Sequence, residues 1–294
     1  MRNVFIIASR ELGTYFGTPL AYIFAVIFVA LTGAFAFFIG NFFDRGQADL
    51  QAFFAYHPWL YLLLVPAIAM RLWAEERKSG TIELLMTLPI ATWEAILGKF
   101  LAAWAFVGIA LMLTFPMWFT VNYLGRPDNG VILASYIGSF LMAGAFLAIG
   151  SSISALTKNQ VIAFIVAATL CFLFVMSGAE MVLNVVRGLS FGLIVQVGGS
   201  FAALVWFVMA ASRGDTQSGA AASVALIAAL LIGWFIGDVG TGFLVQAVTA
   251  LSFLLHHDQI TKGLIGLPSV VFYLSLISFF LFANVIIVEM RKAA

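Results

Sequence analysis

The sequence predicts an all-α integral membrane protein, a polytopic bundle of about eight transmembrane helices. The chain has 294 residues, of which 63% are hydrophobic and 9% are charged, and its mean hydropathy is +1.10. Soluble domains carry about 25% charged residues, so no water-soluble fold fits this composition. Apolar runs long enough to cross a hydrocarbon core of about 30 Å recur along the chain, with short polar links between them.

The N-terminal residues are predicted to lie in the plane of the membrane interface. Phe5, Ala8 and Leu12 recur at helical spacing, while Arg10 falls on another face. We therefore expect residues 1–18 to form an amphipathic interfacial helix. Pro19 can then open the first span without removing a needed donor.

Eight apolar runs are predicted to span the membrane. Pro116 is expected to kink the third of them, with neighbouring helices covering the freed carbonyl. The fourth is rich in Gly, Ala and Ser, which let helices approach closely, so we expect it to be buried among the others. The runs are residues 20–39, 57–70, 97–121, 131–156, 161–177, 189–211, 220–236 and 268–288.

The distribution of lysine and arginine predicts the orientation, because cytoplasmic loops carry an excess of both. Eight spans place both termini and the first long loop on one side, whereas seven would not. That side then holds Arg2, Arg10, Arg71, Arg77, Lys78, Lys99, Lys158, Arg213, Arg291 and Lys292. The other side holds Arg45, Arg126, Arg187 and Lys262. We expect both termini to be cytoplasmic.

Residues 75–89 form the densest polar stretch of the chain. Four consecutive charges, residues 75–78, must be in water or at its boundary, because each costs a few kcal/mol in a bilayer core. Gly80 allows a tight turn, Thr81 can cap a short helix, and Pro89 ends it. The pattern predicts a helix held crosswise between two spans, suited to docking into a partner. The alternative is a polar hairpin that only joins the two spans.

The same stretch carries a family resemblance. Its pattern is Glu-x-Arg-x-x-Gly-Thr-x-Glu-x-Leu-x-x-x-Pro, followed by Trp93-Glu94 and Gly98-Lys99-Phe100. It resembles the first cytoplasmic loop of ABC-2 type transporter permeases, most of all the gliding-motility-associated (GldF-like) branch. In that family the loop holds a coupling helix that inserts into a separate ATPase subunit.

The resemblance implies a coupling loop at residues 75–96. Ile82, Leu85 and Met86 would fill a groove of the ATPase, and Arg77 and Glu83 would orient the loop through charge-assisted hydrogen bonds. The ATPase-coupling residues that it implies are Glu75, Glu76, Arg77, Ser79, Gly80, Thr81, Ile82, Glu83, Leu85, Met86 and Pro89.

Family resemblance also implies one ABC-2 type transmembrane domain over residues 1–294. Its six-span core would carry two extra spans within residues 189–237, although one of these two runs could instead be a re-entrant segment. Residues 238–267 resemble an extracytoplasmic hairpin before the last span.

Few residues suggest chemistry on this chain. His256 and His257 point about 100° apart on a helix and make a poor chelate, so no metal site is predicted. No Gly-x-Ser-x-Gly elbow and no phosphate-binding Gly-x-x-x-x-Gly-Lys-Ser/Thr loop occur, so the chain is predicted to be non-catalytic, with ATP and Mg on a partner. Glu180 and Asp238 are expected at outer span ends in contact with water; the alternative is that they line a path for a cation or polar cargo.

The predicted function is that of the permease subunit of an ATP-driven ABC transporter in the bacterial cytoplasmic (inner) membrane, acting in export or mechanical transmission. By resemblance its partners are an ATPase dimer, a second copy or homologous permease, and an auxiliary membrane subunit with a large extracytoplasmic domain, all within the lipid bilayer. A net charge of +1 gives no sign of nucleic-acid binding. The alternatives are a stand-alone secondary transporter, which predicts an internal repeat and interrupted spans, or a membrane scaffold or assembly subunit.

Overall fold

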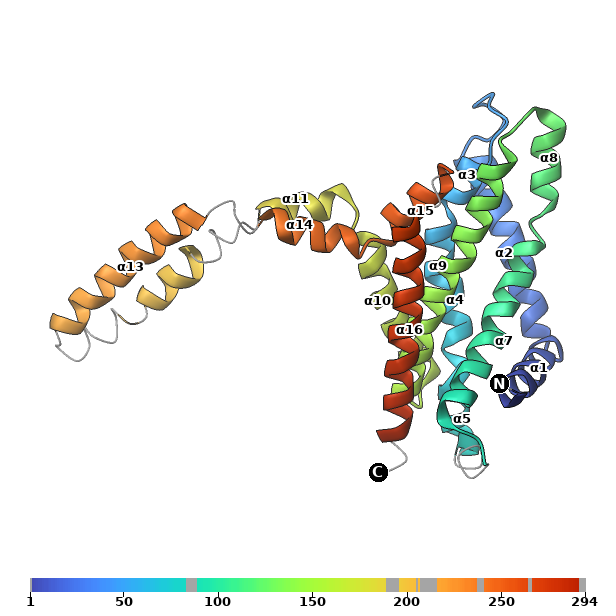
Figure 1. Cartoon of the computed structure of the whole chain (residues 1–294), viewed down its shortest axis with the longest axis horizontal. Helices are drawn as coiled ribbons and strands as arrows, with labels where there is room; N and C mark the ends of the chain where they lie inside the picture. The colour runs from blue at the N-terminus through green and yellow to red at the C-terminus, as the bar shows by residue number, and fades with distance from the viewer. Residues whose placement is uncertain are drawn as a thin grey trace. The chain divides into compact units, whose positions relative to one another are not determined.

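The computed structural model describes residues 2–82, 89–188, 196–204, 206, 216–236, 241–263 and 266–290. All regular elements in these residues are helical, as the composition predicts (Figure 1). Contacts divide the chain into two units, Met1–Val175 with Phe253–Ala294, and Met176–Ser252. The first unit holds the predicted loop.

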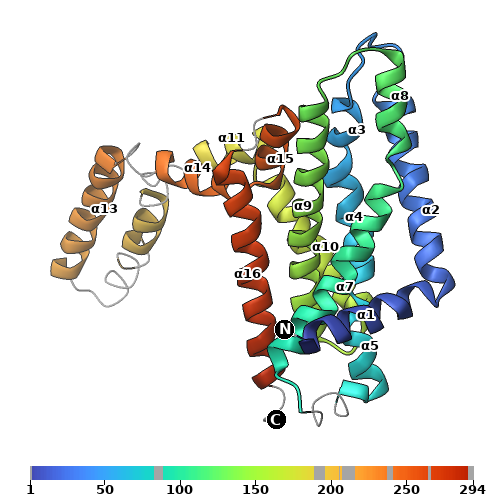
Figure 2. The same ribbon diagram turned by 45° about the vertical axis from the view of Figure 1, so that its right-hand side comes forward.

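Helix α9, Asn129–Leu156, is the centre of the first unit. In the most apolar stretch of 18 residues of α9, 78% of the stretch is buried. Helix α9 packs against α4, α5, α7, α15 and α16 (Figure 2). A Cβ on Gly150 would overlap the Cβ of Ala69, so the missing side chain lets α4 approach α9. The predicted burial of this glycine- and serine-rich run is confirmed. The other helices of the unit are α1 (Arg2–Phe16), α2 (Pro19–Ala34), η1 (Phe35–Ile39), α3 (Gln51–Ala55), α4 (His57–Ala69), α5 (Arg71–Ser79), α7 (Thr92–Met112), α8 (Pro116–Leu124), α10 (Gln160–Met176), α15 (Phe253–Thr261) and α16 (Leu267–Met290).

Four helices within the described residues are long and apolar enough to cross a membrane. They are Ala21–Ile39, Thr92–Leu124, Asn129–Leu156 and Leu267–Met290. A fifth is counted if α10 and the helix that follows it are taken as one broken span. The predicted total of eight stays a prediction.

Pro19 and Pro116 both mark helix starts. Pro19 occupies the first turn of α2, where its missing N–H costs nothing. Pro116 begins α8 after a break at residues 113–115. The carbonyl that a residue with an N–H would bond to from position 116 is that of Met112, and it accepts from Phe115 N–H at 3.0 Å. The turn itself therefore covers this carbonyl, where neighbouring helices were predicted to do so.

Helix α1 forms where predicted, and its side chains divide between a face that packs on α7 and an exposed face that includes Phe5. Val4 and Ile7 are buried, whereas Phe5 is 69% exposed. The reason is α7, which α1 contacts along its length. A Cβ on Gly98 of α7 would lie 2.8 Å from Ile7, so the glycine makes room for Ile7 and sets the rotation of α1. Tyr15 stacks on Phe106 at 5.3 Å.

The ends of the first unit are distinct. Helices α1 and α5 and the last turn of α16 lie at one end, while α3, α8 and α15 lie at the other (Figures 1 and 2). We refer to these as the loop end and the far end. Among the basic residues predicted to share the side of the loop, Arg2 and Arg10 are on α1, and Arg71, Arg77 and Lys78 are on α5.

The second unit contains α11 (Glu180–Gly188), a helix at residues 196–204, α13 (Thr216–Ile236) and α14 (Thr241–Ala250). Helix α11 packs on α14, and a Cβ on Gly199 would lie 2.7 Å from the Cβ of Ala229 on α13. Most of the predicted span 189–211, and Asp238, lie outside the described residues. The predicted span 220–236 corresponds to α13, of which Ala221–Ile232 counts as a shorter apolar helix.

Candidate functional site

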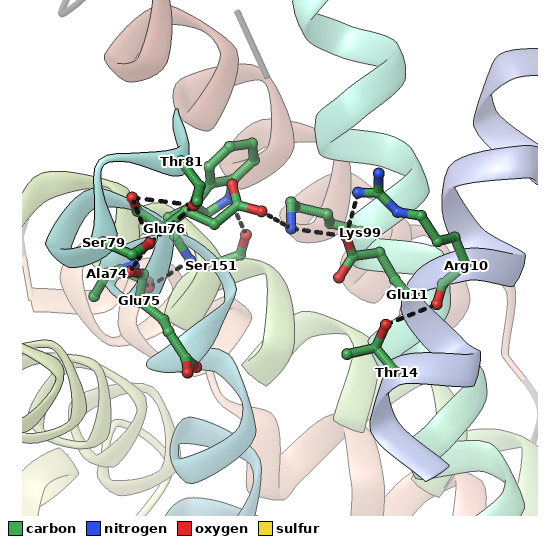
Figure 3. Close-up of polar contacts among 12 residues, drawn as sticks. Arg10, Glu11, Thr14, Ala74, Glu75, Glu76, Ser79, Thr81, Lys99 and Ser151 are labelled. Atoms are coloured by element: carbon green, nitrogen blue, oxygen red, sulfur yellow. Dashed lines mark hydrogen bonds and ion pairs between the residues drawn. The ribbon is translucent and has the colours of Figure 1, made fainter. Parts of the chain in front are cut away.

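Lys99 is the centre of a cluster that joins three helices at the loop end (Figure 3). Its Nζ lies 2.6 Å from Oε1 of Glu76 on α5 and 3.1 Å from Oε1 of Glu11 on α1. The ammonium also lies 5.6 Å from the ring centroid of Trp73. Lys99 itself is on α7 and is only 3% exposed, so its charge depends on these partners. We call Lys99, Glu11, Glu76 and Trp73 the lysine cluster.

The sequence of α5 explains how two members of the cluster come together. Trp73 and Glu76 are three residues apart and therefore lie on one helix face. Gly80 ends the helix with φ +76°, a conformation that glycine adopts without strain. Arg77 and Lys78 in the last turn complement the negative end of the helix dipole.

Serines of α9 hold the start of α5. Ser154 Oγ accepts hydrogen bonds from the backbone N–H groups of Trp73 (3.1 Å) and Ala74 (3.0 Å) and donates to Met70 O (2.8 Å). Ser151 Oγ accepts from Trp73 Nε1 at 3.3 Å and from Asn284 Nδ2 at 2.8 Å. The first N–H groups of a helix have no partner within the helix itself, and here a neighbouring helix supplies it.

The last turn of α5 is attached as well. Arg77 Nη1 donates to the backbone carbonyl of Ala155 at 2.7 Å. Since Ala155 follows Ser154 on α9, both ends of the nine-residue helix α5 are tied to the same short stretch of α9.

Charges within the cluster are balanced by Arg10. Its Nη2 lies 3.0 Å from Glu11 Oε1, so Glu11 receives two cations. Burial by itself would raise the pKa of Glu11, but the Lys99 ammonium and hydrogen bonds from Arg10 and Lys99 outweigh burial and lower the pKa. Glu76 Oε2 is buried and makes no hydrogen bond among the described residues. A cavity of about 380 Å³ lies between α1, α5 and α7 beside these groups.

Comparison with protein families identifies the group to which this helical bundle belongs. The family described as "ABC-2 family transporter protein" matches residues 7–254, most of the chain. The chain belongs to the ABC-2 transporter family. A search of curated proteins found no match. As an ABC-2 permease it is a multi-pass membrane protein, and members of this family generally work with an ABC ATPase.

The structure of this ABC-2 permease places most of the predicted coupling residues. Glu75 pairs with Arg71 on the exposed side of α5, 2.8 Å apart, and Ser79 Oγ lies 3.0 Å from Glu75 O. Thr81 was expected to cap the next helix; instead its hydroxyl bonds back to Ser79 Oγ at 2.9 Å. Thr81 and Ile82 are already helical, and Pro89 is exposed. Glu83, Leu85 and Met86 lie outside the described residues.

Helix α7 starts at Thr92, and the cap position belongs to Ala91. Glu94 lies in the first turn, and its Oε2 accepts from Ala91 N–H at 3.2 Å. The same oxygen accepts from Asn3 Nδ2 at 3.0 Å, which ties α1 to this helix start.

Sequence reasoning missed the lysine cluster. Lys99 was noted as part of a motif and of the charge distribution, not as a partner of Glu76. The available signal was an ionisable residue inside an apolar 21-residue helix, which requires a partner for its charge. Ser151 and Ser154 belong to the predicted Gly-, Ala- and Ser-rich run, and that composition gives no sign of their hydrogen bonds to α5.

The adjacent histidines of α15 bond to different helices. His256 Nδ1 lies 3.1 Å from Ser269 Oγ on α16, and His257 Nε2 lies 2.9 Å from Phe54 O on α3. Within the part of the chain that the structure describes, no group of three or more His, Cys, Asp or Glu side chains could hold a metal ion.

Proposed function

We propose that this ABC-2 permease is the membrane subunit of an ATP-driven transporter and that residues 75–96 receive motion from a separate ATPase. The observation that carries the proposal is the attachment of α5: the lysine cluster joins it to α1 and α7, and Ser154 and Arg77 join it to α9. A force applied to the loop is therefore passed to three other helices.

The charges explain why these helices would move together. Breaking the Lys99–Glu76 pair would leave the buried Lys99 ammonium with Glu11 as its remaining carboxylate partner, at a cost of about 1–2 kcal/mol because Glu76 is partly exposed. The free-energy cost of separating α5 from α7 is thus larger than that of moving them as one body. The second and third spans, which contain or adjoin these helices, would then tilt when the loop is displaced.

The outer part of the loop would make the contact with the ATPase. Ile82, Leu85 and Met86 would fill an apolar groove of the partner, and Glu83 would orient the loop with Arg77. Thr81 is exposed and Ile82 is half-buried, which agrees with an available surface. ATP and Mg would be bound by the partner, since the sequence of this chain has no phosphate-binding loop of the Gly-x-x-x-x-Gly-Lys-Ser/Thr type.

The rest of the assembly follows from the family. We propose two permease subunits, either two copies or a homologous pair, above an ATPase dimer, in the bacterial inner membrane with both termini in the cytoplasm. The loop end of the first unit carries α1, α5 and the last turn of α16, which supports this orientation. The resemblance to the gliding-motility-associated branch favours export or mechanical transmission with an auxiliary membrane subunit, and eight spans in total.

Co-purification tests the coupling loop. The tagged chain is extracted from its native membrane in mild detergent, and ATP hydrolysis and co-eluting chains are measured. We expect an ATPase with the wild type, its loss with Glu83→Lys or Leu85→Asp, and its retention with Glu289→Lys, an exposed acid on α16 outside the loop. If no ATPase elutes with the wild type, or if both loop variants retain it, the proposal is wrong.

A second readout distinguishes a permease from a scaffold. Glu76→Gln removes a carboxylate charge without changing side-chain size and leaves the outer loop intact. In a coupled permease we expect the ATPase to stay bound while substrate- or lipid-stimulated ATP turnover falls several-fold. Unchanged turnover would favour a scaffold to which the ATPase only docks.

A further inference from the structure

Helix α1 has a packed side and an exposed side, and the exposed side has no partner in this chain. Figure 2 shows α1 lying crosswise to the long helices of the first unit, at the loop end. Three contacts with α7 hold the packed side along the length of the helix; they join Asn3 to Glu94, Glu11 to Lys99 and Tyr15 to Phe106. Because α1 is held in this way, a fixed set of side chains is exposed on its other side.

Two large apolar side chains belong to the exposed side of α1. Phe5 is 69% exposed and Ile6 is 59% exposed, although both directly precede the buried Ile7. A helix that lies across the ends of membrane spans places such side chains at the boundary between lipid headgroups and acyl chains. The bilayer would therefore cover apolar surface that this chain leaves uncovered.

The exposed charges of α1 are all positive. The helix contains three charged residues, Arg2, Arg10 and Glu11. Both arginines are exposed, and the side chain of Arg10 is 60% accessible. The side chain of Glu11 is only 17% accessible, and its Oε1 pairs with Lys99 of α7 at 3.1 Å. Positive charge beside exposed apolar side chains complements a leaflet of anionic phospholipid.

Arg10 belongs both to the exposed side of α1 and to the surroundings of the lysine cluster. Its Nη2 lies 3.0 Å from Glu11 Oε1, the same oxygen that receives Lys99 Nζ. Lys99 Nζ lies 2.6 Å from Glu76 Oε1, so charges of alternating sign run from the surface inward. An anion that pairs with Arg10 competes with Glu11 for the guanidinium, because both are acceptors of charge-assisted hydrogen bonds.

We propose that the exposed side of α1 binds anionic phospholipid in the leaflet at the loop end. Arg2 and Arg10 pair with headgroup phosphates, while Phe5 and Ile6 lie against the first carbons of the acyl chains. The lipid is recognised by its negative charge together with its apolar chains, so neither a zwitterionic lipid nor a free phosphate ion satisfies the whole surface.

This binding has a consequence for the lysine cluster. A phosphate on Arg10 draws the guanidinium away from Glu11 and leaves Lys99 as the cation beside that carboxylate. Lipid charge therefore alters how Lys99 is shared between Glu11 on α1 and Glu76 on α5. Lipid binding does not depend on the function proposed above, whereas an effect of lipid on ATP turnover would rest on it.

Titration calorimetry on the purified full chain in neutral detergent tests the surface without an ATPase. The probes are short-chain phosphatidylglycerol, phosphatidylcholine of the same chain length, and inorganic phosphate. The variants are Arg2→Gln, Arg10→Gln and the two combined. The matched control is Lys158→Gln, which removes an exposed positive charge from the connection between α9 and α10. The unfolding temperature of each variant without lipid shows whether it is folded.

We expect the wild type to bind phosphatidylglycerol at least tenfold more tightly than phosphatidylcholine. Each arginine near the surface should contribute about fivefold, which corresponds to about 1 kcal/mol. Each single arginine variant should therefore weaken phosphatidylglycerol binding about fivefold, and the double variant should lose the preference, with less than a twofold change for Lys158→Gln. Equal affinity for the two lipids, inorganic phosphate bound as tightly as the lipid, or equal effects of Lys158→Gln and Arg10→Gln would overturn the proposal.

Phe5→Ser separates the apolar part of the surface from the charged part. It should weaken the binding of both lipids several-fold and by a similar factor, because acyl chains are common to both. Unchanged affinity for both lipids would show that the exposed side of α1 does not reach acyl chains, and would contradict the proposal.

Glu11→Gln tests the link to the lysine cluster. It removes the carboxylate charge that competes for Arg10 and leaves Lys99 paired with Glu76, so phosphatidylglycerol binding should tighten several-fold. In Arg10→Gln/Glu11→Gln this gain should disappear, since Glu11 acts through Arg10. Unchanged or weaker binding by Glu11→Gln, or an equal gain in the double variant, would refute the link.

Discussion

Lys99 Nζ and Glu76 Oε1 lie 2.6 Å apart, so a lysine inside the third span neutralises a carboxylate at the base of the first loop. The two residues are on different helices, and the second oxygen of Glu76 is buried without a hydrogen-bond partner among the described residues. The pair therefore joins α5 to α7, and its removal should have measurable consequences.

Two neighbouring glutamates on α5 should behave differently. Glu76→Ala leaves Lys99, which is only 3% exposed, with Glu11 as its remaining carboxylate partner. It should lower the free energy of unfolding by about 1–2 kcal/mol. This is less than the loss expected for a fully buried pair, because Glu76 is partly exposed. Glu75→Ala removes only an exposed pair with Arg71 and should cost less than about 0.5 kcal/mol. Thermal unfolding in detergent, followed by tryptophan fluorescence, measures both; equal shifts would contradict the cluster.

Ser154→Ala should destabilise the protein more than the loss of a single hydroxyl group suggests. The change leaves the N–H groups of Trp73 and Ala74 without their acceptor, and each buried unsatisfied group costs about 1–3 kcal/mol. Ser278→Ala is the control, because Ser278 is exposed on α16 and bonds only within its own helix. The same unfolding assay applies, and a Ser154 effect no larger than the control would refute the assignment.

Gly98→Ala should separate α1 from α7. The new Cβ would lie 2.8 Å from Ile7, and overpacking of this kind costs about 1–3 kcal/mol. Gly13→Ala has nothing within 4 Å and should be neutral or stabilising by up to about 1 kcal/mol, as alanine favours a helix. The double variant Gly98→Ala/Ile7→Ala should recover part of the loss. Additive effects of the two changes would show that they do not contact each other.

Acidification should lower the free energy of unfolding, because His257 is buried in its neutral form. Burial lowers the pKa of His257 to about 4, while its bond to Phe54 and the charge of Asp258 oppose the change. The unfolded chain, with a histidine pKa near about 6.5, binds the proton first, so stability falls as the pH decreases from about 6.5 to 4. The total loss is on the order of 3 kcal/mol. His257→Gln should flatten this part of the pH profile, and an unchanged slope would contradict the burial.

Several features of the helical bundle could be predicted from the sequence, because the residues that indicate them are close together in the chain. Pro19 marks the start of α2, Pro116 marks the break before α8, and the small residues of residues 131–156 identify the buried helix. Each depends on the chemistry of one residue or on composition along one helix. The coupling roles predicted within residues 75–89 all stay predictions, and Glu83, Leu85 and Met86 also lie outside the described part of the chain.

Sequence by itself determined the class of the protein, its membrane character and its family, because an apolar composition and a short loop motif are properties read along the chain. Tertiary structure alone decided that Lys99 pairs with Glu11 and Glu76, that Ile7 and not Phe5 is buried, and that His256 and His257 bond to different helices. These contacts join residues that are far apart in the chain, or depend on how a helix is rotated. Packing between helices sets both, and no single segment contains that information.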